Sequence, residues 1–310
     1  MTDLVAPHRL RFDQGRYLAV KDPCPVHDGE RWHLFGTAIT APHEFELLHA
    51  VADRIDGPWR LLDPVDVATI DGGCVAAPGV IAEGGDLHMF LQTDYNALDG
   101  RIEHVVSTDG GQSFTHARTA LTSLPGTAEA GIYDPHPALL WGRRFLVYSA
   151  FSVIGQPDIH LAVSESDSWD GPWHRLGPIL RHEQVSCHNQ LGAGDYEWGL
   201  EGAQLVELPD GRVLLNAVCF LPDAPAGCRQ RVFFSVADTP VGPFEVLGPV
   251  LTPPGGDRTG ENGHATVVVQ GDEVQLFLQQ RPLHDGDWHY ALATADVNDV
   301  VRRQIGEVAA

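Results

Sequence analysis

Lysine is almost absent from this sequence: Lys21 is the only one in 310 residues, and every other basic residue is arginine. Basic residues are also few in total, 20 against 42 acidic ones, so the formal net charge is −22. A surface of this sign repels a phosphate backbone, which argues against nucleic acid as a partner and favours a neutral ligand. Solubility or adaptation to salt is the simpler explanation of the charge, and it accounts for the excess better than substrate choice does.

Long apolar runs are missing as well. No stretch of 18 or more apolar residues occurs, so we expect no membrane span and no membrane partner. The first residues, 1–9, lack the basic start and the apolar stretch that are typical of a signal peptide. The sequence therefore predicts a cytoplasmic protein, with an unusual export route as the alternative.

Cysteine is scarce and unpatterned. The five cysteines form no CxxC pair and have no spacing typical of a zinc site. Their odd number, without an export signal, favours reduced thiols; pairing of Cys219 with Cys228 across a hairpin is the alternative. The sequence identifies no histidine partner for a cysteine, so it does not predict a cysteine nucleophile.

Helical periodicity is the last absence that matters. Windows with apolar residues at helical spacing hardly occur, whereas short β-rich runs separated by Gly, Pro, Asp and Asn occur throughout. The 33 glycines and 22 prolines lie mainly between these runs, where turns require them. This pattern predicts an all-β protein.

A turn motif recurs along the chain. Asp-Gly-Pro-Trp stands at 56–59 and at 170–173, Val-Gly-Pro-Phe at 241–244, and a degenerate Asp-Gly-Gly-Gln-Ser-Phe at 109–114. Each copy follows a strand rich in small residues, and a fifth strand of this kind occupies 290–295. The aromatic residue that ends each turn is expected to wedge between neighbouring units.

A polar residue or a proline opens the first strand of each unit, at separations of 56, 56, 67 and 63 residues. Five units of about four strands predict one domain, 1–310, that forms a five-bladed β-propeller, each blade a four-stranded antiparallel sheet. A long sandwich or two β domains is the alternative, which leaves the near-constant spacing to coincidence. The five openers are Asp22, Pro78, Asp134, Glu201 and His264, and the blades span about 17–70, 74–125, 131–182, 199–252 and 262–300.

The openers predict a site, because the innermost strands of a propeller run in the same direction around the axis. Asp22, Asp134 and Glu201 are therefore expected to meet, although no linear motif joins them. Like charges in one pocket raise at least one pKa, and an ionised base beside a protonated acid is what glycoside hydrolysis needs. Either aspartate alone could instead cap a turn before proline, whereas a glutamate that enters an innermost strand needs a reason to be buried.

Five short motifs, one per predicted blade, resemble those of the five-bladed propeller glycoside hydrolases. The resemblance covers the whole chain and is closest to family 43, with more distant similarity to families 32, 62, 68, 117 and 130. Ala76 stands where this family usually has an aromatic residue and Ala203 where it often has proline, so arabinose or xylose specificity does not follow. The motifs are Lys21-Asp22-Pro23, Ala77-Pro78-Gly79-Val80, Tyr133-Asp134-Pro135, Glu201-Gly202-Ala203 and Gly263-His264-Ala265.

The resemblance implies an inverting glycosidase, exo-acting on a small pentoside-like or related glycoside. Asp22 would be the general base and Glu201 the general acid, with Asp134 beside Glu201 to keep it protonated and to hold its rotamer. Inversion predicts about 6.5–9.5 Å between the carboxyl groups of base and acid.

The resemblance also suggests residues around the reacting groups. His264 would face the axis, where it would contact a calcium ion or a water, and no cofactor is required. Four residues are expected to bind substrate, each with a structural role as the alternative: His136, Arg281, Tyr196 and Trp198.

Two other kinds of function remain open at this stage. One is a propeller enzyme with a changed reaction on a small glycoside: a phosphorylase, a transglycosylase or a biosynthetic enzyme. A phosphorylase needs a basic cluster for phosphate, and mainly Lys21 and Arg281 lie near the openers. The other is a non-catalytic sugar-binding propeller, which has no need for three buried acids.

Overall fold

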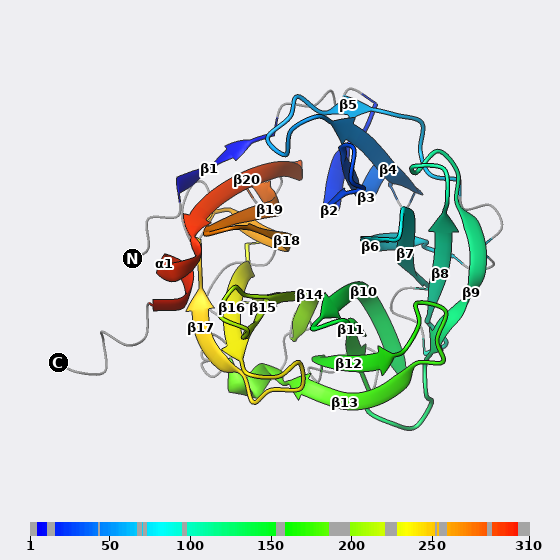
Figure 1. Ribbon diagram of the computed structural model, residues 1–310, viewed down its shortest axis with the longest axis vertical. Coiled ribbons are helices and arrows are strands. Elements are labelled where there is room, and N and C mark those ends of the chain that lie inside the picture. Colours follow the sequence, from blue (N-terminus) through cyan, green and yellow to red (C-terminus); the bar gives the residue numbers. More distant parts are fainter. Residues whose placement is uncertain are drawn as a thin grey trace.

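The computed structural model describes residues 5–10, 16–42, 44–66, 70, 73–94, 98–152, 159–185, 199–220, 228–251, 253, 259–283 and 287–302. In these segments the chain forms twenty β-strands, one 3₁₀ turn (η1, His182–Gln184) and one short helix (α1, Val297–Arg302). The strands form five four-stranded antiparallel sheets arranged around a central axis (Figure 1). This arrangement confirms the predicted all-β fold, a five-bladed β-propeller.

Four of the sheets are each continuous in sequence, with the first strand innermost. Blade 1 contains β2 (Ala19–His27), β3 (Trp32–Ala41), β4 (Glu44–Ala52) and β5 (Arg60–Leu61). Blade 2 contains β6 (Ala76–Glu83), β7 (Asp86–Thr93), β8 (Arg101–Ser107) and β9 (Thr115–Thr122). Blade 3 contains β10 (Gly131–Leu140), β11 (Arg143–Phe151), β12 (His160–Ser166) and β13 (His174–Leu180). Blade 4 contains β14 (Leu200–Glu207), β15 (Val213–Phe220), β16 (Gln230–Ala237) and β17 (Glu245–Pro249).

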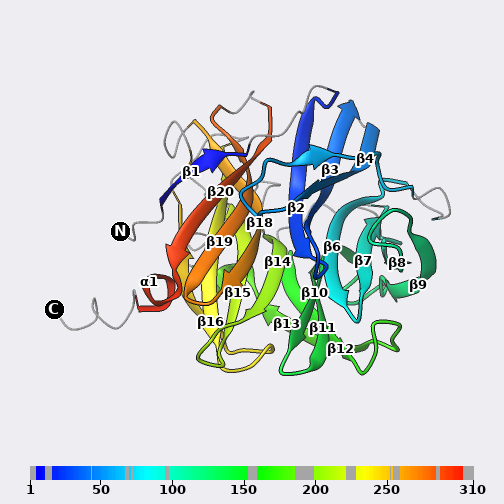
Figure 2. The same cartoon turned by 45° about the horizontal axis from the view of Figure 1, so that its top comes forward.

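The fifth blade joins the two ends of the chain. Its inner strands are β18 (Glu261–Gln270), β19 (Glu273–Arg281) and β20 (His289–Asp296), and its outer strand is β1 (Val5–Arg9). β1 pairs antiparallel with β20 and lies along it in both views (Figure 1 and Figure 2). The predicted span of this blade, 262–300, thus contains three of its four strands, and an N-terminal strand closes the ring.

In the described residues the hydrophobic core forms five clusters, each between two adjacent sheets. One cluster, for example, contains Val147 of blade 3 and Leu215 of blade 4, and another contains Phe35 of blade 1 and Met89 of blade 2. The middle strands are buried most completely, and every residue of β15 is buried. A sheet that is covered on both faces by its neighbours needs apolar side chains on both faces, which explains these uninterrupted apolar runs.

The aromatic residues after the turn motifs wedge between blades, as predicted. Each packs its ring edge against an aromatic residue on a middle strand of the preceding blade. The pairs are Trp59 with Phe277, Phe114 with Phe35, and Trp173 with Phe90, with ring centroids 6.2, 5.8 and 5.6 Å apart. The turn motif therefore serves the packing between blades.

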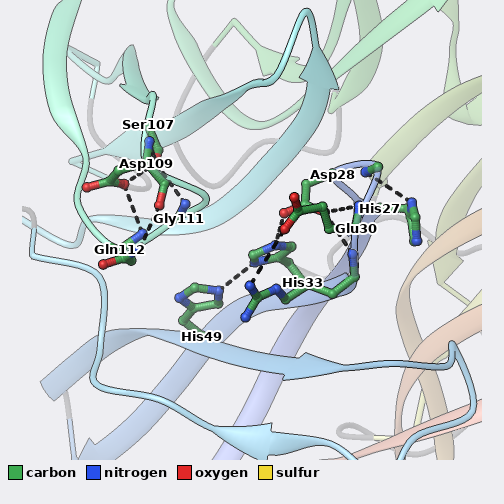
Figure 3. A network of polar contacts seen from close by, with 11 residues as sticks. His27, Asp28, Glu30, His33, His49, Ser107, Asp109, Gly111 and Gln112 are labelled. Atoms are coloured by element: carbon green, nitrogen blue, oxygen red, sulfur yellow. Dashed lines mark hydrogen bonds and ion pairs between the residues drawn. The ribbon is translucent and has the colours of Figure 1, made fainter.

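A buried histidine pair of blade 1 lies at the interface with blade 2 (Figure 3). His33 Nδ1 lies 2.9 Å from His49 Nε2, and His33 Nε2 lies 2.9 Å from Asp28 Oδ2. A turn of blade 2 closes over the pair at Gly111, where a Cβ atom would lie 3.1 Å from the ring of His49. Burial lowers the pKa of His49 to about 3. This interface therefore contains uncharged histidine.

Two further predictions concern thiols and membranes. Cys219 and Cys228 are both buried and are not joined by a disulfide, so the alternative of pairing between them is wrong. In the described part of the chain, no helix has the length and apolar character needed to cross a membrane.

Candidate functional site

Each innermost strand has a β-bulge at the same level of the axis. The pairing register shifts after Lys21, Ala76, Tyr133, Glu201 and Asn262 in the five blades. The next residue has a positive φ in four of them: 54° at Asp22, 50° at Ala77, 49° at Asp134 and 57° at Gly202. A bulge puts two residues opposite one and so breaks the alternation of sides, which lets consecutive side chains face the axis.

The spacing of the openers suggested that they occupy equivalent positions in the five blades, but they do not. Asp22 and Asp134 occupy the first bulge position, whereas Glu201 precedes that position and Pro78 and His264 follow it. The carboxylates nevertheless converge, because each bulge directs consecutive residues toward the axis. The sequence pattern thus locates the level of the site and misplaces three openers by one residue.

Side chains of the preceding blade support the bulges that carry the two aspartates. The backbone N–H of Asp22 donates to Gln279 Oε1 at 2.8 Å, and that of Asp134 donates to Gln92 Oε1 at 2.9 Å. A buried N–H without an acceptor costs about 1–3 kcal/mol, so these glutamines stabilise an unusual backbone conformation. Sequence reasoning missed both glutamines, because they lie in middle strands far along the chain.

His264 lies at the centre of the acidic groups. Its Nδ1 atom is 2.8 Å from Asp22 Oδ1, and its Nε2 atom is 3.4 Å from Glu201 Oε2 and 3.5 Å from Asp134 Oδ2. All four side chains are at most 13% exposed. The structure therefore brings together the three acids that the sequence predicted to meet, with an imidazole ring between Asp22 and Glu201.

Two contacts from β10 to β14 hold the acids in place. Tyr133 donates its hydroxyl hydrogen bond to Glu201 Oε1 at 3.2 Å, and the backbone N–H of Gly202 donates to Asp134 Oδ2 at 3.3 Å. Tyr133 was not among the predicted site residues. Its place directly before Asp134, matching the place of Glu201 before Gly202, is the signal that could have identified it.

The charges in the pocket differ sharply between the two aspartates. Burial opposes ionisation of Asp22, but the charge and the hydrogen bond of His264 lower its pKa to about 2. Burial raises the pKa of Asp134 to about 7, with Glu201 and Asp22 adding to the effect and His264 opposing it. Burial disfavours a charged His264, yet Asp134 and Asp22 raise its pKa well above the usual value. At neutral pH the site therefore holds an ionised Asp22, a charged imidazole and a proton on or near Asp134.

A small pocket lies at the bulges, on the axis around which the five inner strands are arranged (Figure 1). Its empty space is about 320 Å³, which includes the open mouth. Twelve residues line it: Asp22, Pro23, Ala77, Pro78, Asp134, Pro135, His136, Gly202, Ala203, His264, Ala265 and Thr266.

Comparison with known proteins gives a result only at the level of structure. No protein-family model matches the sequence, and no curated protein matches it. A thermostable family-43 glycoside hydrolase superposes with a TM-score of 0.66 at 17% identity, over 89% of this chain and 88% of that one. An endo-arabinase from Bacteroides thetaiotaomicron gives a TM-score of 0.68 at 14% identity, over 89% and 94% of the two chains. An α-L-arabinofuranosidase from Podospora anserina gives 0.61 at 13% identity, over 95% and 98%.

The chain has the fold of the family-43 glycoside hydrolases. At these identities the likeness establishes the architecture, and the chemistry depends on the side chains of this chain. The family-43 fold here presents three acids and one histidine at the level of the bulges.

The predicted substrate-binding residues are not all in the pocket of this family-43 fold. His136 lines it, with Nδ1 3.0 Å from the carbonyl oxygen of Pro137, and burial lowers its pKa to about 4, so it is uncharged at neutral pH. Arg281 is not among the lining residues. Its guanidinium pairs with Glu261 at 2.6 Å and lies over the ring of Trp288. Tyr196 and Trp198 lie outside the described residues.

The predicted calcium site can be tested against the donor atoms. Asp134, Glu201 and His264 each offer one atom, and these atoms lie within 4.8 Å of one another. Calcium takes six to eight oxygen ligands, whereas this group offers two carboxylates and one imidazole nitrogen. These residues therefore fit calcium poorly, and we derive no step through a metal.

Proposed function

We propose that the protein is an inverting glycoside hydrolase of the family-43 type. The observation that carries the proposal is that Asp22 and Glu201 lie on opposite sides of His264, at the level of an axial pocket that Asp22 and His264 line. The fold of solved family-43 enzymes supports it. A small carbohydrate is the substrate class that this fold and pocket suit.

The reaction needs one base and one acid on opposite sides of the scissile bond. Asp22, whose pKa is about 2, is ionised and takes a proton from the water that attacks the anomeric carbon. Glu201 gives its proton to the glycosidic oxygen as the bond from that oxygen to the anomeric carbon breaks. One water is consumed, and the sugar leaves with inverted configuration. The imidazole lies between the two carboxyl groups, and the proposed inversion requires about 6.5–9.5 Å between them.

Asp134 and His264 act on these two groups. Asp134 holds or shares a proton beside Glu201, and its own carboxylate is fixed by the N–H of Gly202. His264 pairs with Oδ1 of Asp22, and the Thr37 side chain also hydrogen-bonds to this carboxylate, so both residues hold the base in place. Asp134 and His264 are therefore proposed as positioning residues, and neither bonds to the sugar.

The pocket suggests exo action on a terminal sugar. The pocket is small, and short side chains such as Ala77, Pro78 and Pro135 form part of its wall. The structural neighbours include an endo-1,4-β-xylanase, an endo-arabinase and an α-L-arabinofuranosidase, which supports a pentoside-like sugar as the first choice here. A cytoplasmic location stays a prediction.

The test is a panel of aryl arabinofuranosides, xylosides, galactosides and anhydrogalactosides. We expect one of them to be turned over, with Glu201→Gln slower by about 10²–10⁴-fold on a poor leaving group. Proton NMR of the first-formed product should show the inverted anomer.

Three results would contradict parts of the proposal. Turnover of none of the glycosides would reject the hydrolase, and a fully active Glu201→Gln would reject the acid. Turnover that requires inorganic phosphate would identify a phosphorylase instead.

A further inference from the structure

We propose that Tyr133 is a positioning residue for the acid Glu201, and that it acts only in the step that delivers the proton. The inference rests on the proposed function. Its starting point is that the two carboxyl oxygens of Glu201 have different partners. Oε1 accepts from the Tyr133 hydroxyl at 3.2 Å, whereas Oε2 lies 3.4 Å from His264 Nε2.

The repeat geometry explains why these two side chains meet. Tyr133 and Glu201 occupy the same position, the residue before the bulge, in the adjacent inner strands β10 and β14. The next residues of the two strands, Asp134 and Gly202, also contact each other. Two consecutive residues of β10 thus contact the two corresponding residues of β14, so the tyrosine–acid contact is part of the registered packing of blades 3 and 4.

The orientation of the tyrosine ring is set before substrate arrives. Tyr133 is 1% exposed, and its ring packs beside that of Phe151, with centroids 6.0 Å apart. Phe151 in turn lies over Gly131, its partner in the register, where a Cβ atom would be 2.1 Å from the ring. Only glycine at 131 leaves room for Phe151. The phenol therefore presents its hydroxyl to Glu201 from a rigid, packed position.

The chemistry of this contact follows from the charge that the acid gains. When Glu201 gives up its proton it becomes a carboxylate, and a hydroxyl that donates to Oε1 then makes a charge-assisted hydrogen bond, which is stronger than the neutral one. With Oε1 engaged, the transferable proton belongs on Oε2. Tyr133 should thus stabilise the transition state most when the leaving group needs a full proton, and hardly at all when it needs none.

The experiment compares leaving groups in a variant that keeps the ring. Tyr133→Phe should lower kcat about tenfold on the phenyl glycoside of the sugar that wild type turns over fastest, because phenol leaves poorly without a proton. On the 2,4-dinitrophenyl glycoside, which needs no proton to leave, the change should stay within about twofold. Tyr148→Phe is the matched control: Tyr148 is also fully buried and donates to a carboxylate, Glu129 Oε2 at 2.9 Å, away from the pocket. It should leave the ratio between the two substrates unchanged.

A double-mutant cycle separates action through Glu201 from a general structural effect. In the Glu201→Gln background, Tyr133→Phe should cause no further loss on the phenyl glycoside. An equal loss on both substrates, or a full additional loss in the Glu201→Gln background, would overturn the inference while leaving the hydrolase intact. Absence of any wild-type turnover would overturn both.

Discussion

The axial pocket and the interface between the first two blades both bury histidine beside carboxylate, yet they hold it in opposite protonation states. His264 lies within 3.5 Å of three carboxylates, and Asp134 and Asp22 raise its pKa although burial opposes the charge. His33 has one carboxylate, Asp28, and there burial lowers the pKa of the histidine.

The carboxylates themselves explain part of this difference. Burial opposes ionisation of Asp28, but hydrogen bonds from the backbone N–H groups of Arg31 and Glu30 and from His33 lower its pKa to about 2. Its negative charge is thus already balanced by backbone donors. Asp22, Asp134 and Glu201 instead share one histidine, so their combined charge outweighs desolvation. The number of carboxylates and their other partners decide the charge of a buried histidine.

Removing one carboxylate from each site should separate their functions most clearly. Asp22→Asn is expected to lower kcat by about 10²–10⁴-fold on any glycoside that wild type hydrolyses, because the attacking water loses its base. Asp28→Asn, the matched change at the blade interface, should leave kcat unchanged. Steady-state kinetics of the two variants measures this, and comparable losses in both would mean that Asp22 acts through the fold.

Removing the histidine from the pocket should leave three acids without their cation. His264→Gln is expected to lower the free energy of unfolding by about 3–5 kcal/mol at pH 8, since one partner of a buried ion pair is lost. The deficit should grow as the pH falls from 8 toward about 6.5, because folded His264 already holds its proton there, whereas the unfolded chain takes it up only near the ordinary pKa of histidine. Urea denaturation at pH 8, 7 and 6 measures it.

The control for that measurement is another histidine of the pocket wall. His136→Gln should show a deficit that stays constant between pH 8 and pH 7 and becomes smaller below about 6.5, because the pKa of folded His136 is about 4 and the unfolded chain binds the extra proton. If the His264→Gln deficit became smaller in the same way, the charge assigned to His264 would be wrong.

The interface histidine should make stability depend on pH in the opposite sense. The folded pKa of His49 is about 3, and the unfolded value is about 6.5, so the unfolded chain binds the extra proton between them. Stability is therefore lost as the pH falls below about 6.5. His49→Phe should reduce the loss between pH 7 and pH 5 by about 2 kcal/mol. The exposed His174→Gln serves as control, and an unchanged slope in His49→Phe would refute the assignment.

The smallest effect is expected at the residues behind the bulges. Gln279→Ala and Gln204→Ala each remove a side-chain acceptor of an inner-strand N–H, that of Asp22 and that of Val267. Both should lower the free energy of unfolding by about 1–2 kcal/mol. Only Gln279→Ala should also lower kcat, by about tenfold, because Asp22 then shifts. Equal activity of the two variants would show that the bulge holds Asp22 without Gln279.

Much of the architecture could be predicted because its causes are local and repeated. The turn motifs, the strand patterns and the spacing of the openers each reflect a sheet that must be covered on both faces, so they recur with the blade. The fourth strand of the fifth blade could not be predicted in this way. β1 carries no turn motif of its own, and its partner β20 lies at the other end of the chain.

The sequence by itself determined that five similar β units meet at an axis and that Asp22, Asp134, Glu201 and His264 approach one another there. Only the tertiary structure decided the one-residue offsets between them and the contacts that Tyr133 and Gln279 make. It also decided that Arg281 pairs with Glu261 and does not line the pocket. The reason is physical. A sequence repeat reflects the strands and turns that each blade needs, whereas the bulges and the contacts between blades determine which atoms face each other. The protonation states follow from those contacts, since burial and neighbouring charges act over a few ångströms in space rather than along the chain.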